Sequence, residues 1–257
     1  MKRIWILVAA AILLTLSVVV LATFPAAVAW RWWGERVPDL KLQGISGTVW
    51  NGTATRVTVR GQVLGRMDWQ VPFAALVRGA HSVRVDLSGP GLQLKAVIAR
   101  QSADALALSE LNAQAEAEWL GPALAIPELE PTGLVVTENA SLVLSRGGMP
   151  QAIDAAIEWR NAGVRGQVVA RLGTILIQAH GRDGRIQASV VDQGDGEVEI
   201  RGTASIDQGS YRSETILVPR VEQGPVVEAL QWVGAPRPGG GRVLIVEGRI
   251  TVLEENL

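Results

Sequence analysis

The sequence contains no cysteine, so it can form neither a disulfide nor a thiolate metal site. Because disulfides are permitted but not required outside the cytoplasm, this absence does not decide the compartment. Histidine is also scarce, since His81 and His180 are the only two and lie far apart in the chain. Neither has a second histidine or a carboxylate at metal-ligand spacing. The sequence therefore predicts no zinc or other transition-metal site.

An excess of charge is absent too, because the formal net charge is only −1. This balance offers no basic surface to nucleic acid. No Gly-x-Ser-x-Gly elbow occurs, and Gly239–Arg242 lacks the Lys-Ser/Thr ending of a phosphate loop. The acidic stretch 192–197 lacks the spacing of a calcium-binding EF-hand loop and is interpreted as a solvated hairpin tip. We therefore predict that the protein is not an enzyme and has no cofactor.

Phenylalanine and tyrosine are rare, with two and one copies, whereas tryptophan occurs nine times. Small aliphatic side chains must therefore build most of any core. The tryptophans that follow the N-terminal region are interpreted as packing anchors whose indole N–H groups donate to carbonyl oxygens. They are Trp50, Trp69, Trp119, Trp159 and Trp232. An apolar groove between curved sheets, lined by these side chains, remains the alternative.

Residues 4–30 form a long run without a charged residue. As a helix, this run would extend roughly 40 Å, which is enough to cross a hydrocarbon layer of ~30 Å. Indole rings favour the level of the lipid headgroups, so tryptophans at both ends of the run predict two interfacial belts. These are Trp5 at one end and Trp30, Trp32 and Trp33 at the other. The pattern predicts a transmembrane anchor that spans the lipid bilayer.

A cleaved signal peptide is the alternative interpretation of the same run. The small residues at 27–29 resemble a cleavage site, and Lys2 and Arg3 would supply the charged start. However, the apolar part is longer than the ~7–15 residues of a signal peptide. The short cationic tail, residues 1–3, favours a cytoplasmic N-terminus with the bulk of the chain on the other side of the membrane.

After a polar connector at 31–43, the pattern changes to alternating strands with frequent turns over 44–257. Turn residues recur at roughly 8–12-residue spacing, which indicates an antiparallel, twisted β domain. Asn51-Gly52 is expected to close the first strand as a hairpin turn. The predicted strands are 44–52, 53–60, 62–71, 82–87, 92–99, 105–111, 112–119, 134–136, 141–144, 152–159, 167–171, 174–179, 185–191, 197–205, 211–218 and 242–252. Alanine-rich 112–119 also remains compatible with a helix.

Prolines across 121–133 predict a crossing loop, which would separate two halves at 44–120 and 134–257. A weak echo between residues 59–66 and 164–171 is compatible with related halves or with convergence of strand-glycine-strand segments. Near the end of the chain, Pro225 begins an apolar helical stripe that Gly234 closes. We expect this short C-terminal helix to pack over an end of the sheet.

Several segments together resemble a known family. They include the block Gly47, Trp50, Asn51 and Gly52, then 67–71 with Trp69, then 73–79, Trp159–Gly166, 202–220 and the helix before a glycine-rich turn. In these features, and in its single anchor, the chain is similar to the type II secretion system protein N family. The similarity covers essentially the whole chain, although its motifs are structural and degenerate.

The resemblance implies a bitopic protein of the bacterial inner membrane with a periplasmic domain. Such a protein would be an accessory of the machine that exports folded proteins, with other inner-membrane components of that system as its partners. The family supplies no catalytic residues. The chain is also reminiscent of larger membrane-anchored β-groove proteins proposed to handle lipid, so a lipid ligand stays open as the second hypothesis.

Overall fold

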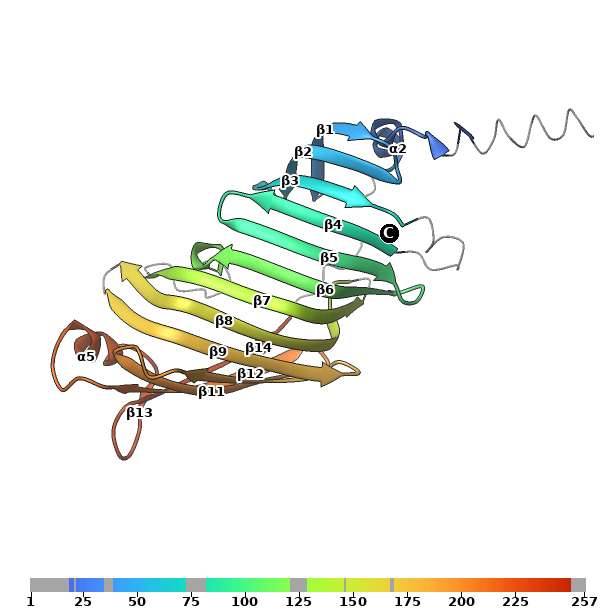
Figure 1. Ribbon diagram of the computed structural model, residues 1–257. Helices are drawn as coiled ribbons and strands as arrows, with labels where there is room; N and C mark the ends of the chain where they lie inside the picture. Colours follow the sequence, from blue (N-terminus) through green and yellow to red (C-terminus); the bar gives the residue numbers. More distant parts are fainter. Residues whose placement is uncertain are drawn as a thin grey trace, which may run out of the picture. The chain divides into compact units, whose positions relative to one another are not determined.

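The computed structural model describes residues 19–20, 22–34, 39–72, 82–120, 129–145, 147–166 and 169–250. The chain divides into two compact units, Met1–Pro90 and Gly91–Leu257. Both units are built from antiparallel strands (Figure 1), as the alternation and the turn spacing predict. The expected mainly antiparallel β fold with one short C-terminal helix is confirmed. The two predicted halves of the β domain stay a prediction.

The first unit combines a short helix with four sequential strands. These are α2 (Ala26–Trp33), β1 (Leu40–Gly47), β2 (Asn51–Val59), β3 (Gln62–Gln70) and β4 (Ser82–Gly89), with each strand paired to the next. The segment before α2 is tied to the first hairpin, because Val49 N donates to Phe24 O at 3.1 Å. Pro25 also forms a β-bridge with Thr48. The helix therefore packs against β1.

The predicted anchor lies largely outside the described residues. Among the helices that the structure describes, none is long and apolar enough to cross a membrane. Trp5 is not described, whereas Trp30, Trp32 and Trp33 belong to α2. Trp32 is exposed and its ring lies 5.9 Å from that of Phe24, centroid to centroid. The span at 4–30 and the interfacial role of these tryptophans stay predictions.

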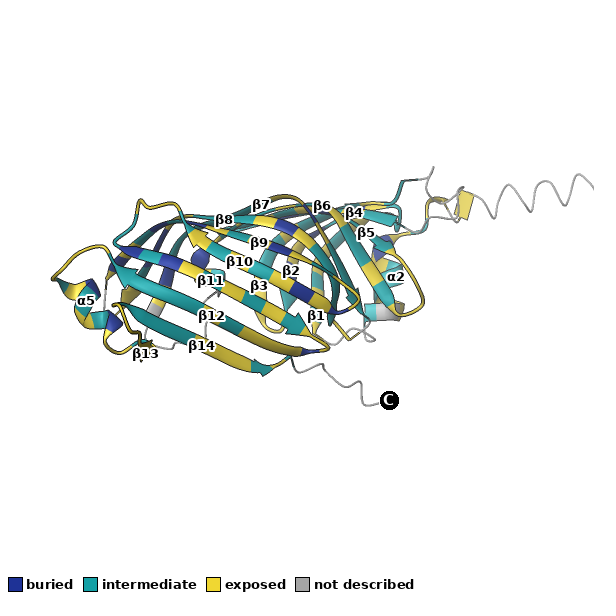
Figure 2. Ribbon diagram, turned by 90° about the horizontal axis from the view of Figure 1, so that it is seen from below, coloured by how far each residue is buried: buried dark blue, intermediate teal, exposed yellow. Residues whose placement is uncertain are grey.

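The second unit contains the longer strands. They are β5 (Leu92–Arg100), β6 (Ala105–Glu116), β7 (Leu129–Ser145), β8 (Pro150–Gly166), β9 (Ala170–Arg182), β10 (Arg185–Asp192), β11 (Val198–Asp207), β12 (Ser210–Pro219), β13 (Ala235–Pro236) and β14 (Arg242–Arg249). The 3₁₀ helix η2 (Ala117–Leu120) follows β6, and α5 (Pro225–Leu230) follows β12. Strand order is sequential up to β12, after which β14 and then β13 complete the sheet. Figures 1 and 2 show this sheet twisting and bending along its length.

One face of this sheet is apolar. Directly paired residues share a face, so the register places a row of aliphatic side chains across β5 to β11, interrupted only by a glycine. The row consists of Ile98, Leu108, Leu142, Ile153, Gly181, Ile186 and Ile206. Most of these side chains are only half-buried. We call this surface the apolar face.

Helix α5 packs at one end of the apolar face. Its Val226 and Leu230 join a buried cluster with Ile175, Val198 and Ile200 from β9 and β11. Pro225 occupies the first turn, where the missing N–H would have no helical partner. The position of the helix over an end of the sheet is confirmed. The helix stops at Leu230, however, before the predicted end at Gly234.

Several predicted boundaries are wrong. The Asn51-Gly52 pair lies inside β2, and the turn is formed instead by residues 48–50, since Gly47 pairs with Gly52. Residues 40–43, expected in the connector, belong to β1. Residues 129–133, expected in the crossing loop, begin β7, whereas 121–128 lie outside the described residues. Residues 112–116 form strand, as predicted, whereas 117–119, expected in the same strand, belong to the 3₁₀ helix η2.

Candidate functional site

Most of the glycines and tryptophans of the family-like motif meet at one end of the first unit. Gly47 on β1 pairs with Gly52 on β2, which pairs with Trp69 on β3. Trp50 lies in the intervening turn, and its carbonyl oxygen accepts a hydrogen bond from Val71 N at 2.7 Å. Trp159 belongs to β8 of the second unit. The motif residues therefore build a strand junction, and their functional role stays a prediction.

Close packing explains the glycines of this junction. A Cβ on Gly52 would overlap the Trp69 ring and would lie 2.8 Å from Ser46 O. Gly47 has φ +85°, a left-handed conformation that other residues rarely adopt. Asn51 is exposed at the start of β2, and its N–H donates to Thr48 Oγ1 at 3.1 Å. This arrangement is a tight structural corner.

The remaining tryptophans divide into packed and exposed ones. Trp159 contacts the buried cluster beneath α5, and its Nε1 donates to Thr132 O at 2.9 Å, which confirms its predicted packing role. Trp119 is partly buried in η2. Trp232 is 90% exposed, so the prediction of a packing anchor is wrong for this residue. Trp232 lies past the last turn of α5 and therefore outside the row of helix side chains that packs against the sheet.

The loop that carries Trp232 is held in place by a single arginine. Arg242, the first residue of β14, donates from Nε to Val233 O at 2.9 Å and from Nη2 to Gly234 O at 2.7 Å. The same Nη2 lies 2.8 Å from Gln231 O. Three carbonyl oxygens around Trp232 thus share one guanidinium. The sequence offers no local signal for this clamp, since Arg242 simply follows a glycine run.

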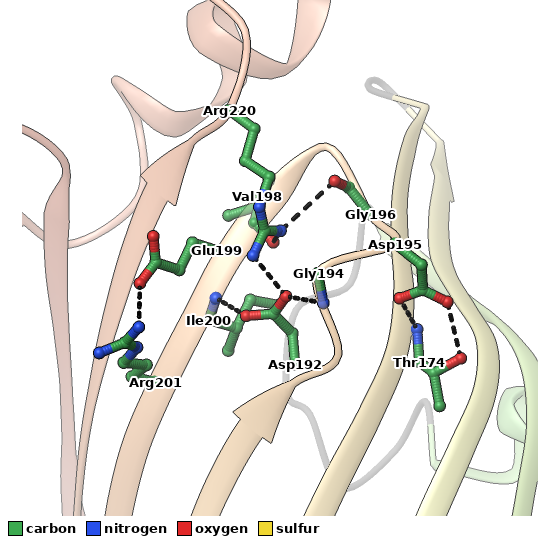
Figure 3. A network of polar contacts seen from close by, with 10 residues as sticks. All are labelled: Thr174, Asp192, Gly194, Asp195, Gly196, Val198, Glu199, Ile200, Arg201 and Arg220. Atoms are coloured by element: carbon green, nitrogen blue, oxygen red, sulfur yellow. Dashed lines mark hydrogen bonds and ion pairs between the residues drawn. The ribbon is translucent and has the colours of Figure 1, made fainter.

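A second arginine fixes the turn between β10 and β11 (Figure 3). The Asp192 side chain is only 2% exposed, and its Oδ2 lies 2.6 Å from Arg220 Nη2. Its two carboxylate oxygens also accept hydrogen bonds from Ile200 N and Gly194 N, both at 2.7 Å. Arg220 Nη1 donates to Val198 O at 2.7 Å. The prediction of a solvated tip is therefore wrong for Asp192.

These contacts determine the pKa of Asp192. Burial would raise the pKa of the carboxyl, but hydrogen bonds from Ile200 N, Arg220 and Gly194 N outweigh it and hold the pKa below its ordinary value. The pKa of Asp195 is lowered by the N–H and hydroxyl of Thr174, at 2.7 and 2.8 Å. Both carboxylates are thus engaged in tying strands together. In the described part of the chain, no group of three side chains is arranged to hold a metal ion.

The opposite face of the second unit carries a polar hollow of about 500 Å³ on β9 to β12. Its lining includes Gln178, His180, Gln187, Thr203, Arg212 and Glu214. His180 Nδ1 lies 2.8 Å from Asp154 Oδ1, and both side chains are exposed. Most of the residues around this hollow are polar or charged, whereas the lining of ligand pockets is predominantly hydrophobic and aromatic.

These features define a class of protein: an antiparallel β protein in which the buried side chain of Asp192 ties strands together and the exposed Trp232 lies on a loop that Arg242 holds. Residues 38–244 match the family described as type II secretion system (T2SS), protein N. The chain belongs to this family. No curated protein and no solved structure matches the chain at a significant level.

Proposed function

We propose that the protein is an accessory component of the type II secretion machinery whose β domain binds and stabilises other components during the export of folded proteins. The observation that carries the proposal is the family match over residues 38–244, which includes most of both units. A role as a binding module and not as an enzyme also agrees with the use of Asp192 and Arg220 in holding the fold.

The location follows from the same proposal. Membership of a secretion-system family supports an association with a membrane. We place the protein in the bacterial inner membrane as a single-pass protein, with residues 1–3 in the cytoplasm, 4–30 in the bilayer and the β domain in the periplasm. The uncharged run at 4–30 and the cations before it support this topology.

Deletion followed by an assay of exported enzymes tests the secretion role. We expect export to fall when the chain is deleted and to recover when the full chain is supplied again. Because an accessory subunit can be dispensable, crosslinking of the full chain to other secretion components is measured in parallel. Unchanged export together with no crosslink to any secretion component would refute the proposal.

A second candidate function, the binding or transfer of lipid, is favoured by one observation. The apolar face of the second unit presents rows of aliphatic side chains that are only half-buried, such as Ile157, Ile177 and Val190. A lipid-binding trough needs a contiguous apolar strip of more than a few hundred Å². The polar lining of the hollow on the other face argues against lipid there.

Purification without detergent separates the two candidates. If the β domain carries acyl chains, lipids co-purify with it, and a charge placed on the apolar face at Ile177 removes them. If the domain serves only to bind protein partners, the purified domain carries no lipid and the crosslinks to secretion components persist. Lipid retention together with unchanged export and no such crosslinks would favour the second candidate.

A further inference from the structure

The sheet of the second unit ends in a strand with an uncovered edge. Strand β14 pairs with β12 over its whole length, from Arg242 with Leu217 to Arg249 with Ser210, without a shift in register. On its outer side, β13 pairs only with Arg242 and Val243. Within the described residues, no strand therefore covers the outer edge of Leu244–Arg249. As far as the described residues go, the outward-facing N–H and C=O groups of this segment are therefore available to pair with another chain.

The segment Leu244–Arg249 contains no lysine, proline or bulge, although Glu247 and Arg249 give it two charges of opposite sign. Ile245 and Val246 are 49% and 42% exposed, one on each face of the sheet. Glu247 is charged but forms an ion pair with Arg212 of the neighbouring β12. An apolar, regular edge of this kind favours association with another strand.

Strand β1, which begins the sheet of the first unit, differs in each of these respects. It carries the exposed Lys41, and Gly44 at φ +62° interrupts its regular backbone. Helix α2 also packs against it. The edge strand of the first unit is therefore protected by a lysine, an irregular backbone and a helix. In the part of the chain that the structure describes, the edge strand β14 of the second unit has none of these three features.

The exposed indole of Trp232 lies at the beginning of the same edge. The clamped loop at 231–234 leads directly into β13 at Ala235, and Arg242 of β14 holds that loop. A large aromatic side chain on a fixed backbone loses little conformational entropy on binding, which is typical of an interface anchor. The loop that carries Trp232 and the open edge thus both adjoin β14.

We propose that an extended segment of another protein adds to the sheet as a strand along Leu244–Arg249, and that Trp232 enters an apolar pocket of the same partner. The best match is a segment with apolar side chains opposite Ile245 and Val246 and an acidic one opposite Arg249. This inference rests on the proposed secretion role, because it names the surface through which a partner is bound.

The backbone of the edge identifies the partner as a protein. The outward-facing N–H and C=O groups of the edge alternate along the strand. A peptide backbone offers matching C=O and N–H groups, whereas an acyl chain offers none. The exposed charges beside the surface are mixed, with Glu228 and Arg237 among them, so they offer no basic field to anionic lipid.

A second copy of the chain fits less well. Since β13 already covers Arg242 and Val243, two β14 strands related by a two-fold axis could pair around Val246 or around Glu247. The first pairing places Ile245 opposite Glu247, an apolar side chain against a charged one, and the second places the two Glu247 side chains opposite each other.

Site-specific photocrosslinking in secreting cells tests the proposal with the full chain. A photoreactive phenylalanine replaces Ile245 in one variant and Val191 in the other. Val191 is the matched control, because it is 46% exposed but lies on β10, between two paired strands. We expect the Ile245 probe, but not the Val191 probe, to crosslink to one defined peptide of a secretion component, identified by mass spectrometry.

Substitutions then test the two parts of the surface. Val246→Lys should reduce the Ile245 crosslink at least tenfold, Trp232→Ala should reduce it severalfold, and Val191→Lys should leave it unchanged. Thermal unfolding of each purified variant confirms that it is folded. If Val246→Lys unfolds the chain, the effect of Trp232→Ala on the Ile245 crosslink becomes the test of the proposal. The Trp232 side chain is almost fully exposed, so its removal should leave the chain folded.

Four outcomes would overturn the inference. These are an Ile245 crosslink to a second copy, a crosslink to lipid alone, equal yields from the two probe sites, or slow exchange in the isolated chain of those amides of Leu244–Arg249 that face away from β12. If export fails on deletion but partners crosslink elsewhere, the edge inference fails while the secretion role stands. If Ile245 crosslinks to a protein outside the secretion machinery, export is unchanged and no site of the chain crosslinks to a secretion component, the secretion role fails and the edge is still a binding site.

Discussion

At the scale of single residues, the Asp192–Arg220 pair offers a test of what holds the second unit together. Replacing Asp192 with asparagine removes the charge that Arg220 contacts and should lower the free energy of unfolding by about 1–3 kcal/mol. Asp207→Asn is the control, because its ion pair with Arg185 is 3.7 Å long and largely exposed. Such a surface pair contributes about 0–1 kcal/mol. Denaturant unfolding at neutral pH measures the free energy of unfolding of the two variants. Equal losses of stability in Asp192→Asn and Asp207→Asn would contradict the special role of Asp192.

The pH dependence of stability follows from the same carboxyl. The folded pKa of Asp192 lies below the ordinary 3.8, so its stabilising contribution is complete above that value and is lost as the pH falls through the folded pKa. The loss of unfolding free energy in acid should therefore be smaller in Asp192→Asn than in the unaltered chain. Unfolding at a series of acidic pH values measures this, and parallel pH profiles would show that Asp192 does not contribute.

The glycine–tryptophan contact of the first unit makes a separate prediction. Gly52→Ala would place a methyl group inside the Trp69 ring and should cost about 1–3 kcal/mol, the usual range for overpacking. Trp69→Leu should relieve part of this cost when the two changes are combined. A double-mutant cycle measures the coupling, and strictly additive losses would mean that the backbone of Ser46 causes the clash instead.

At the scale of elements, α5 should be necessary for the fold while the loop after it should not. Leu230→Ala empties a buried site beneath the helix and should cost about 2–5 kcal/mol. Trp232→Ala should change the free energy of unfolding by no more than about 0.5 kcal/mol, because the indole is 90% exposed. Thermal or denaturant unfolding measures both variants. A large loss of stability in Trp232→Ala would show that this side chain supports the fold, and would contradict its proposed role in binding a partner.

The strands show how far the sequence alone could predict the elements. Alternation located nearly every strand, but it divided β6, β7 and β9 each into two. In β6 and β7, a non-glycine residue takes the left-handed conformation at the place where the register shifts, Glu110 with φ 50° and Asn139 with φ 51°. Such a bulge has the same local signature as a turn, because only long-range pairing keeps the strand continuous.

The side chains that tie the second unit together were harder to predict. Asp192 and Arg220 are far apart in the sequence, and Arg242 acts on carbonyl groups of a preceding loop. Composition and spacing give no information about which charged residues will be buried. The end of α5 was placed too late because the stripe of apolar residues continues to Val233, although the helix stops at Leu230.

At the scale of the whole molecule, the type of fold and the family followed from distributed features, namely turn spacing, alternation and degenerate motifs. These survive errors in single boundaries, which is why the family resemblance was correct while the first hairpin turn was misplaced. Whether the apolar face is covered by a partner or holds lipid is a property of the assembled protein. Alternation assigns side chains to a face and says nothing about what covers that face.

Topology is the last prediction, and it concerns the whole chain. With residues 1–3 in the cytoplasm and the bilayer crossed at 4–30, a reporter fused at the C-terminus that works only in the cytoplasm should be inactive, whereas one that works only in the periplasm should be active. The physical reason is that short loops obey the positive-inside rule while long domains are translocated largely regardless of charge. N-terminal sequencing of the mature protein separates a retained anchor from a cleaved signal peptide. A mature chain that begins at Trp30 would exclude the anchor, and a reporter active in the cytoplasm would reverse the topology.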